Sequence, residues 1–177
     1  MRVLFAGGGT GGHINPAISI ADYAAKQDKD FKALFVGTKS GLETKLVPKA
    51  GYDIEYIEIQ GFDRKHIFRN FETVKKLISA RRKCNKIIKE FKPDCIVCTG
   101  GYVSGPIVLE AEKMGIPTAI HEQNAYPGVT TRILSKKADI VMLTMEEAAE
   151  YFDKSVKYIK TGLPVRKGFD PSRISRA

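Results

Sequence analysis

Short apolar runs rich in β-branched and aromatic residues alternate along this chain with segments of helical period, and this alternation restricts the possible folds more than any other feature. The runs with strand character are RVLFA, KALFV, YDIEYIEI, DCIVC, PTAIH, DIVML and VKYIK. The segments with helical character cover residues 16–27, 41–50, 67–91, 106–114, 130–136 and 145–152. Strands that alternate with helices predict βαβ units, so we expect an α/β fold with a doubly wound, Rossmann-like parallel sheet of about seven strands.

Three loops of unusual composition follow predicted strands at their carboxyl ends. They read GGGTGGH after the first strand, TGGYVSGP after the fourth and HEQNAYPG after the fifth. Ligands of open parallel sheets bind outside the carboxyl ends of the strands. Because the three loops come from distant parts of the chain and meet at one edge, we expect them to form a single site.

The first loop contains a GxGxxG match at Gly7, Gly9 and Gly12, which is the spacing of a dinucleotide-binding fingerprint. That fingerprint also needs an acidic residue at the end of the second strand to bind the ribose, but the second strand here ends in Gly37 and Thr38. A nicotinamide-dependent oxidoreductase is therefore disfavoured. A Walker loop is excluded because the letters HI stand where Lys and Ser/Thr are required.

The glycine loops favour anion binding, because glycine leaves successive backbone N–H groups unobstructed. Asn15 and Pro16 predict the N-cap and the first position of the next helix, and a helix N-terminus attracts phosphate. Gly100, Gly101 and Gly105 precede a second predicted helix start in the same way. Two phosphate-binding helix starts are thus predicted, with ordinary tight turns as the alternative.

Two of the loops carry side chains suited to chemistry. His13 follows the first glycine run, and an imidazole accepts a proton near pH ~6.5, so His13 is compatible with either a general base or a structural cap. His121, Glu122, Gln123 and Asn124 directly follow an apolar strand. Amide side chains donate and accept hydrogen bonds at once, which suits sugar hydroxyls, although a loop cap explains the same residues.

Positive charge is concentrated in one segment of the chain. The net charge is +9 over 177 residues, and residues 63–92 hold 11 Lys and Arg against 3 acids. Cations and apolar residues are interleaved at the start of this segment, in a patch made of Arg64, Lys65, Ile67, Phe68, Arg69, Phe71 and Lys75. The mixture indicates an anionic membrane surface rather than nucleic acid as the partner, with a solvated basic helix face as the alternative.

The cysteines do not indicate a metal or redox site. Cys95 and Cys98 have CxxC spacing but lie in an apolar run, where residues three apart point to opposite faces of a strand. We expect plain core cysteines and no metal. No apolar stretch approaches the ~20 residues that span a bilayer, and the N-terminus is a strand rather than a signal peptide, so we expect a cytoplasmic protein.

Five motifs together resemble a known family. GGGTGGHINPA, LVPKAG, GGYVSGP, HEQN and TGLPVR occur in the order of the N-terminal half of the bacterial peptidoglycan N-acetylglucosaminyltransferases, the MurG family, and cover residues 2–166. The resemblance implies the N-terminal domain of a two-domain GT-B glycosyltransferase, bound peripherally at the cytoplasmic face of the inner membrane. The family moves GlcNAc from UDP-GlcNAc to the C4 hydroxyl of the muramoyl sugar of lipid I (undecaprenyl-diphospho-MurNAc-pentapeptide), which gives lipid II with inversion. No cofactor is expected.

The resemblance also implies roles for individual residues. Positions that contact the donor are matched by Thr10, Gly11, Gly12, Asn124 and Arg166. Loops proposed to face the acceptor diphosphate contain Gly9, Gly100, Gly101, Tyr102 and Ser104. The expected catalytic residues are His13, which matches a proposed general base, and Glu122, which lies in the loop that lines the cleft. The basic and apolar patch matches the region credited with membrane association.

The resemblance covers only one of the family's two domains. We expect an N-terminal domain at residues 1–163 and the start of an interdomain linker at 164–177, with the C-terminal domain supplied in cis or in trans. The chain is then an excised domain or one subunit of a split enzyme, and we expect no transfer activity from it alone. A non-catalytic subunit that recruits a catalytic partner to the membrane is the alternative function.

Overall fold

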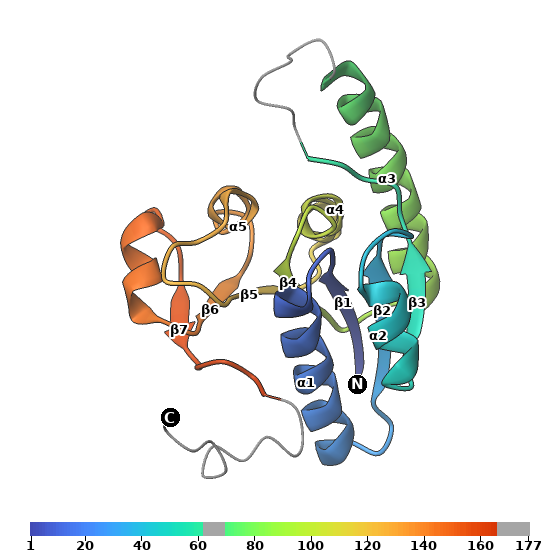
Figure 1. The fold of residues 1–177 in the computed structure, drawn as a ribbon, viewed down its shortest axis with the longest axis horizontal. Coiled ribbons are helices and arrows are strands. Elements are labelled where there is room, and N and C mark those ends of the chain that lie inside the picture. The colour runs from blue at the N-terminus through green and yellow to red at the C-terminus, as the bar shows by residue number, and fades with distance from the viewer. Residues whose placement is uncertain (62–69, 166–177) are drawn as a thin grey trace, which may run out of the picture.

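The computed structural model describes residues 1–61 and 70–165, and this part of the chain contains a parallel sheet covered by helices (Figure 1). The strands are β1 Arg2–Gly7, β2 Lys32–Gly37, β3 Asp53–Tyr56, β4 Cys95–Gly100, β5 Thr118–Glu122, β6 Ile140–Leu143 and β7 Tyr158–Lys160. The helices are α1 Gly11–Gln27, α2 Glu43–Lys49, α3 Asn70–Phe91, α4 Ser104–Met114 and α5 Val129–Leu134, with a 3₁₀ helix η2 at Glu146–Tyr151.

The sheet has seven strands in the order β3-β2-β1-β4-β5-β6-β7, and every neighbouring pair is parallel. The order reverses direction between β1 and β4, where the chain crosses from one half of the sheet to the other. The predicted doubly wound, Rossmann-like α/β fold is therefore confirmed. The reversal places the loops after β1 and β4 next to each other at the carboxyl edge, which is where such sheets bind ligands.

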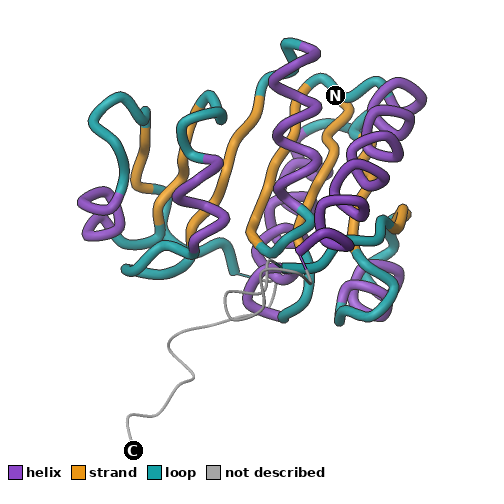
Figure 2. The backbone as a smooth tube through the Cα atoms, turned by 90° about the horizontal axis from the view of Figure 1, so that it is seen from above, coloured by secondary structure: helices purple, strands orange, loops and turns teal. Residues whose placement is uncertain are grey.

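Helices cover both faces of the sheet (Figure 2), and a hydrophobic core lies between the sheet and the helices on each face. Val3 and Phe5 of β1 face α1 and α2, while Leu4 and Ala6 face α3, α4 and α5. This alternation follows from the period of two along a strand. It also separates the CxxC cysteines, because Cys98 belongs to the core under α3 and α4 whereas Cys95 packs on the α1 side. Cys98 is buried and Cys95 half-buried in these cores, so the two lie on opposite faces of the sheet as the strand period predicts.

The start of α1 differs from the sequence-based prediction. Asn15 and Pro16 were expected at the N-cap and first position, but the helix begins at Gly11 with Thr10 as its N-cap, and Pro16 lies inside it. Packing explains the longer helix. Ile14, Ala17, Ile18 and Ala21 all lie in the core below α1, so the extra turn buries Ile14 completely. The gain from that burial exceeds the cost of glycine in a first helical turn.

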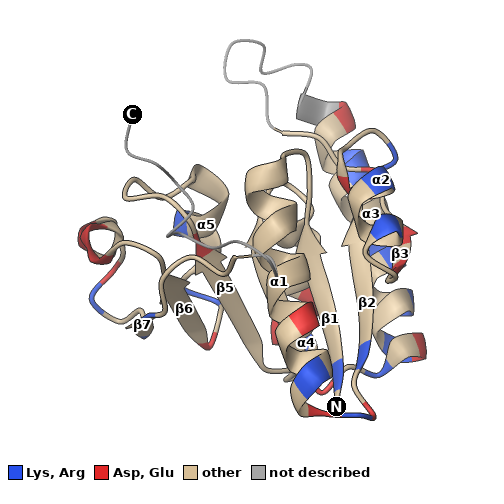
Figure 3. Ribbon diagram, turned by 60° about the horizontal axis from the view of Figure 1, so that its bottom comes forward, with Lys and Arg blue, Asp and Glu red and all other residues tan. Residues whose placement is uncertain are grey.

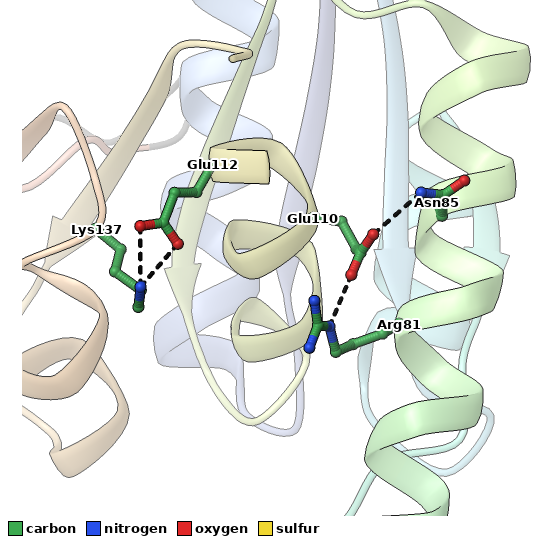
Figure 4. Close-up of polar contacts among 5 residues, drawn as sticks. All are labelled: Arg81, Asn85, Glu110, Glu112 and Lys137. Atoms are coloured by element: carbon green, nitrogen blue, oxygen red, sulfur yellow. Dashed lines mark hydrogen bonds and ion pairs between the residues drawn. The ribbon is translucent and has the colours of Figure 1, made fainter. Parts of the chain in front are cut away.

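On the face of the sheet covered by α3, α4 and α5, side-chain hydrogen bonds and ion pairs join α4 to its neighbours (Figure 4). Glu110 of α4 is buried and accepts hydrogen bonds from Arg81 Nε at 2.7 Å and Asn85 Nδ2 at 3.0 Å, both on α3. Glu112 accepts two hydrogen bonds from the ammonium of Lys137, which follows α5. No helix in the part of the chain that the structure describes is long and apolar enough to cross a membrane.

Candidate functional site

A cleft of about 880 Å³ opens at the carboxyl edge of the sheet. The loops after β1, β4 and β5 all line it, as the sequence predicts, and α5 and the segments after β2 and β3 complete its walls. Of the expected site residues, the lining includes Gly9, Thr10, His13, Gly100, Gly101, Tyr102, Glu122 and Asn124. Residues far apart in the sequence are thus brought to one site.

The His13 ring contacts the backbone of the first glycine loop. Its Nδ1 lies 3.1 Å from the carbonyl oxygen of Gly8. A carbonyl oxygen only accepts hydrogen bonds, so in the neutral imidazole this contact favours the proton on Nδ1 and leaves the lone pair on Nε2. The imidazole is half-buried and lines the cleft, which leaves Nε2 as a potential proton acceptor.

Two glycines of the loop after β4 are required by close approach to the first loop. Gly100 has φ +114°, and a Cβ on it would lie 2.7 Å from Cδ2 and 2.8 Å from Nε2 of His13. Gly101 has φ +80°, and a Cβ there would lie 2.7 Å from the Gly8 carbonyl oxygen. The ring of His13 therefore lies directly against the backbone of the second glycine loop, and larger residues would separate the two loops.

A carboxylate that the sequence did not identify as a site residue lies beneath the first loop. Glu43, at the start of α2, is fully buried. It accepts hydrogen bonds from the N–H of Gly9 at 2.9 Å and from both the N–H and the hydroxyl of Thr38 at 2.8 Å. Burial alone would raise its pKa, but these donors outweigh burial and hold the pKa of Glu43 below its ordinary value.

Glu43 changes the interpretation of Gly9. The loop was predicted to offer its N–H groups to phosphate, but the N–H of Gly9 donates to Glu43 instead. The N–H groups of Gly11 and Gly12 begin α1 and have no acceptor within the helix, so the anion-binding capacity of the first loop is concentrated there. Gly12 is exposed and Gly11 half-buried, next to Thr10 on the cleft wall.

In the second glycine loop, residues 100–105, several polar groups form hydrogen bonds within the loop itself. Ser104 is buried and donates its hydroxyl to the Gly100 carbonyl oxygen at 3.1 Å. The N–H groups of Ser104 and Gly105 donate to the carbonyl oxygens of Gly101 and Tyr102. The Tyr102 ring, by contrast, is 60% exposed and lines the cleft. Within this loop Tyr102 is the side chain placed to touch a ligand, and Ser104 holds the turn.

Glu122 organises the loop after β5. Its side chain is buried, and Oε1 accepts hydrogen bonds from the backbone N–H and the Nδ2 of Asn124 at 3.0 and 2.9 Å. Its Oε2 accepts from the N–H of Gly128 at 3.2 Å, just before α5. These bonds fix the amide of Asn124, which is exposed at the cleft. This geometry suits a positioning role for Glu122.

His121 and Gln123 connect the cleft to the last described segment. The Nε2 of His121 lies 3.0 Å from the Gly162 carbonyl oxygen, and its Nδ1 lies 3.0 Å from Nε2 of Gln123. The same amide nitrogen of Gln123 donates to the carbonyl oxygen of Thr99 at 2.9 Å. Burial is the main cause that lowers the pKa of His121, so the ring is neutral here.

Other predicted residues lie partly or wholly outside the described structure. Residues 62–69 and 166–177 are not described, so the expected contributions of Arg64, Lys65, Ile67, Phe68, Arg69 and Arg166 stay predictions. The side chain of Phe71 is not described either, whereas Lys75 on α3 is exposed. Lys and Arg occur repeatedly along α3 (Figure 3).

Sequence reasoning missed the wall formed after β2 and β3. Thr38, Ser40 and Gly41 line the cleft there, with Gln60 beside them. Gln60 accepts a hydrogen bond from Lys76 Nζ and donates to the Thr73 hydroxyl, both at 2.8 Å, which ties this wall to α3. The local sequence contains no signal that distinguishes these cleft-lining polar residues from ordinary loop residues. Among the described residues, no group of His, Cys, Asp and Glu is arranged to hold a metal ion.

The family model of the glycosyltransferase family 28 N-terminal domain matches residues 3–143 of this chain. A curated relative from Caldanaerobacter subterraneus subsp. tengcongensis, named UDP-N-acetylglucosamine–N-acetylmuramyl-(pentapeptide) pyrophosphoryl-undecaprenol N-acetylglucosamine transferase, is 50% identical over 94% of this chain and 46% of its own length. A relative of the same name from Finegoldia magna is 48% identical over 96% of this chain. The chain spans about half the length of the curated relatives that it matches.

Solved structures agree with this result. The crystal structure of Acinetobacter baumannii MurG is 33% identical with a TM-score of 0.77, and the match covers 92% of this chain and 46% of that one. A UDP-GlcNAc 2-epimerase from Neisseria meningitidis has a TM-score of 0.65 at 14% identity and shares the fold alone.

Proposed function

This chain belongs to the glycosyltransferase family 28 N-terminal domains, and from that premise we propose that it is the acceptor-binding half of an inverting transferase that moves GlcNAc from UDP-GlcNAc to lipid I. The observation that carries the proposal is the position of His13, whose protonated Nδ1 is held by Gly8 while the ring lines the cleft between two glycine loops. The names of the half-identical relatives supply the substrates.

The chemistry required is proton removal from a sugar hydroxyl. The C4 hydroxyl oxygen of the muramoyl sugar attacks the anomeric carbon of GlcNAc from the face opposite UDP. The bond between that carbon and the diphosphate breaks, and its electron pair leaves with UDP. The hydroxyl proton passes to Nε2 of His13, which the tautomer leaves free to accept it. Glu122 acts by holding Asn124 and the start of α5 in place.

The two substrates use different parts of the cleft in this proposal. The first turn of α1, with Thr10, Gly11 and Gly12, faces the donor together with Asn124, and Arg166, which lies outside the described residues, is expected to contribute as well. The acceptor diphosphate lies over the second glycine loop beside Tyr102. A second domain, joined through a linker that begins near residue 164, completes the donor site. Transfer by the 177-residue chain alone is therefore not expected.

The membrane-facing surface is proposed to be the N-terminal end of α3 and the segment before it, at the cytoplasmic face of the inner membrane. Val74 and Ile78, one turn apart on α3, are 42% and 48% exposed, and Lys75 lies beside them. Apolar side chains among cations suit an anionic lipid surface, where each cation contributes about 1 kcal/mol. Binding to vesicles with anionic lipid that weakens steeply with salt supports this assignment, and binding indifferent to both variables contradicts it.

The proposed function is tested by His13→Ala in a complete transferase that contains this chain. Loss of the base lowers kcat by about 100-fold or more, with KM for both substrates little changed. His13→Gln serves as the matched variant, because its amide keeps a polar side chain but supplies no base. A higher KM for the acceptor at unchanged kcat would instead make His13 a binding residue and refute its role as the base.

A further inference from the structure

The Gly8–Gly9 peptide joins two groups that the sequence keeps 30 residues apart. Its N–H donates to the carboxylate of Glu43 at 2.9 Å, and its carbonyl oxygen accepts from Nδ1 of His13 at 3.1 Å. A trans peptide is planar and rigid, with its N–H and C=O pointing in opposite directions. Glu43 and His13 therefore lie on opposite sides of one rigid unit.

From this geometry we propose that Glu43 is a positioning residue for His13, acting through the Gly8–Gly9 peptide to hold the imidazole in the Nδ1–H tautomer. A carboxylate that accepts the N–H of a peptide polarises it and strengthens the carbonyl oxygen as an acceptor. The stronger acceptor favours the proton on Nδ1 and fixes the plane of the ring. In the neutral ring Nε2 then carries the lone pair, and the fixed ring plane holds that lone pair in one direction.

The surroundings of this peptide leave it little freedom. A Cβ on Gly8 would lie 2.6 Å from Oε1 of Glu43, and a Cβ on Gly101 would lie 2.7 Å from the Gly8 carbonyl oxygen. Glu43 itself is anchored on its other side by the N–H and hydroxyl of Thr38. The peptide is thus enclosed between the carboxylate and the second glycine loop, and it transmits the position of one group to the other.

The charge of Glu43 is maintained at neutral pH. Burial opposes ionisation, but the donors from Thr38 and Gly9 lower its pKa below the ordinary value, so the carboxylate keeps its full accepting strength. In the described structure the ionised oxygens have only uncharged donors within hydrogen-bonding distance. A positive side chain does not compete with the peptide for the carboxylate there.

The proposal is tested by ¹⁵N NMR of the His13 imidazole in this 177-residue chain. We expect the Nδ1–H tautomer in the unchanged chain. In Glu43→Gln, which keeps the shape but not the charge, the ratio of Nδ1–H to Nε2–H should fall by about 3- to 10-fold. Thr38→Val is the matched control, because it removes one donor to Glu43 but keeps the charge and the bond to Gly9, and its ratio should stay much closer to that of the unchanged chain than to that of Glu43→Gln.

Two results would overturn the proposal. One is a dominant Nε2–H tautomer in the unchanged chain, and the other is an unaltered ratio in a folded Glu43→Gln variant. If Glu43→Gln does not fold, a scalar coupling across the hydrogen bond from His13 Nδ1–H to the Gly8 carbonyl carbon, measured in the unchanged chain, decides instead. Its presence supports the proposal and its absence contradicts it.

The effect of Glu43 on catalysis rests on the proposed function, and it is measured separately from the tautomer, by the kcat of the complete enzyme. In a complete transferase that contains this chain, Glu43→Gln should lower kcat by about 10-fold at unchanged KM for both substrates. If Glu43→Gln changes the tautomer of His13 but not kcat, the proposed role of Glu43 in positioning His13 stands, and the role of His13 as the base is refuted. If the complete transferase without any substitution transfers no GlcNAc, the proposed function is refuted, whichever tautomer His13 adopts.

Discussion

Several glycines of the two loops have a specific close neighbour, whereas a Cβ on Gly9 or Gly105 would meet nothing within 4 Å, and these neighbours explain part of the glycine-rich sequence without phosphate binding. Gly8 makes room for Glu43, Gly100 for the His13 ring, and Gly101 for the Gly8 carbonyl. The sequence pattern predicted a backbone that something approaches closely. In the structure much of what approaches it is the protein itself, and in the first loop the N–H groups of Gly11 and Gly12 at the start of α1 are the ones without an acceptor inside the helix.

Substitution of Gly100 tests this interpretation. Gly100→Ala places a Cβ 2.7 Å from the His13 ring at φ +114°, so we expect a loss of about 3 kcal/mol in the free energy of unfolding. Gly105→Ala is the matched control, because its Cβ meets nothing within 4 Å and its helical position favours alanine by about 0.5–1 kcal/mol. Chemical denaturation measures both, and equal stabilities of the two variants would contradict the argument.

His121 gives stability a defined pH dependence. Burial lowers its pKa in the folded protein, against the raising effects of the Gly162 carbonyl and Glu122. Below the ordinary value of 6.5 the unfolded chain therefore binds more protons than the folded one. The free energy of unfolding should fall as the pH is lowered from about 7 to about 5, by at most about 1.4 kcal/mol per pH unit.

The assignment to His121 is checked with His121→Gln. The fall between pH 7 and pH 5 should become shallower in that variant, because the titrating group is gone. Carboxylates whose pKa is lowered by folding, such as Glu110 with its ordinary value of 4.5, lose their stabilising effect only at lower pH. A pH dependence identical to that of the unchanged chain would show that another group titrates.

At the scale of elements, the interface between α3 and α4 depends on one buried acid. Arg81→Ala removes a charged donor from Glu110, whose side chain is only 6% exposed, so we expect a loss of about 1–3 kcal/mol in the free energy of unfolding. Lys137→Ala removes the partner of Glu112, whose side chain is 43% exposed, and should cost less than about 1 kcal/mol. Thermal or chemical unfolding of both variants provides the comparison, and an equal loss in the two would contradict the role of burial.

The sequence predicted elements well where the pattern is local. Seven apolar runs became the seven strands, and strand periodicity placed Cys95 and Cys98 on opposite faces. The predicted start of α1 was wrong, because Asn15 and Pro16 are local signals for a helix start, whereas burial of Ile14 against the sheet is a long-range effect. The expected helix over 145–152 is a 3₁₀ helix at Glu146–Tyr151, and the third strand is shorter than its apolar run.

At the scale of the whole molecule, the parallel sheet explains why so much of the site could be predicted. Once the strands are parallel, the loops after β1, β4 and β5 must lie at one edge. Glu43 could not be found in the same way, because an acid followed by a helical pattern looks like any exposed acid until its burial is known. Its partners Gly9 and Thr38 follow different strands, and only the fold brings them together.

If the carboxyl edge of this domain binds the acceptor of a GlcNAc transferase, a titration with that acceptor should reveal the binding surface. A water-soluble short-chain analogue of lipid I is added to the ¹⁵N-labelled 177-residue chain while backbone amide shifts are followed. We expect saturable shifts centred on residues 8–13 and 100–102, with no shifts at the opposite edge of the sheet, where Asp94 precedes β4. Saturable binding elsewhere, or no binding in a folded chain, would contradict it.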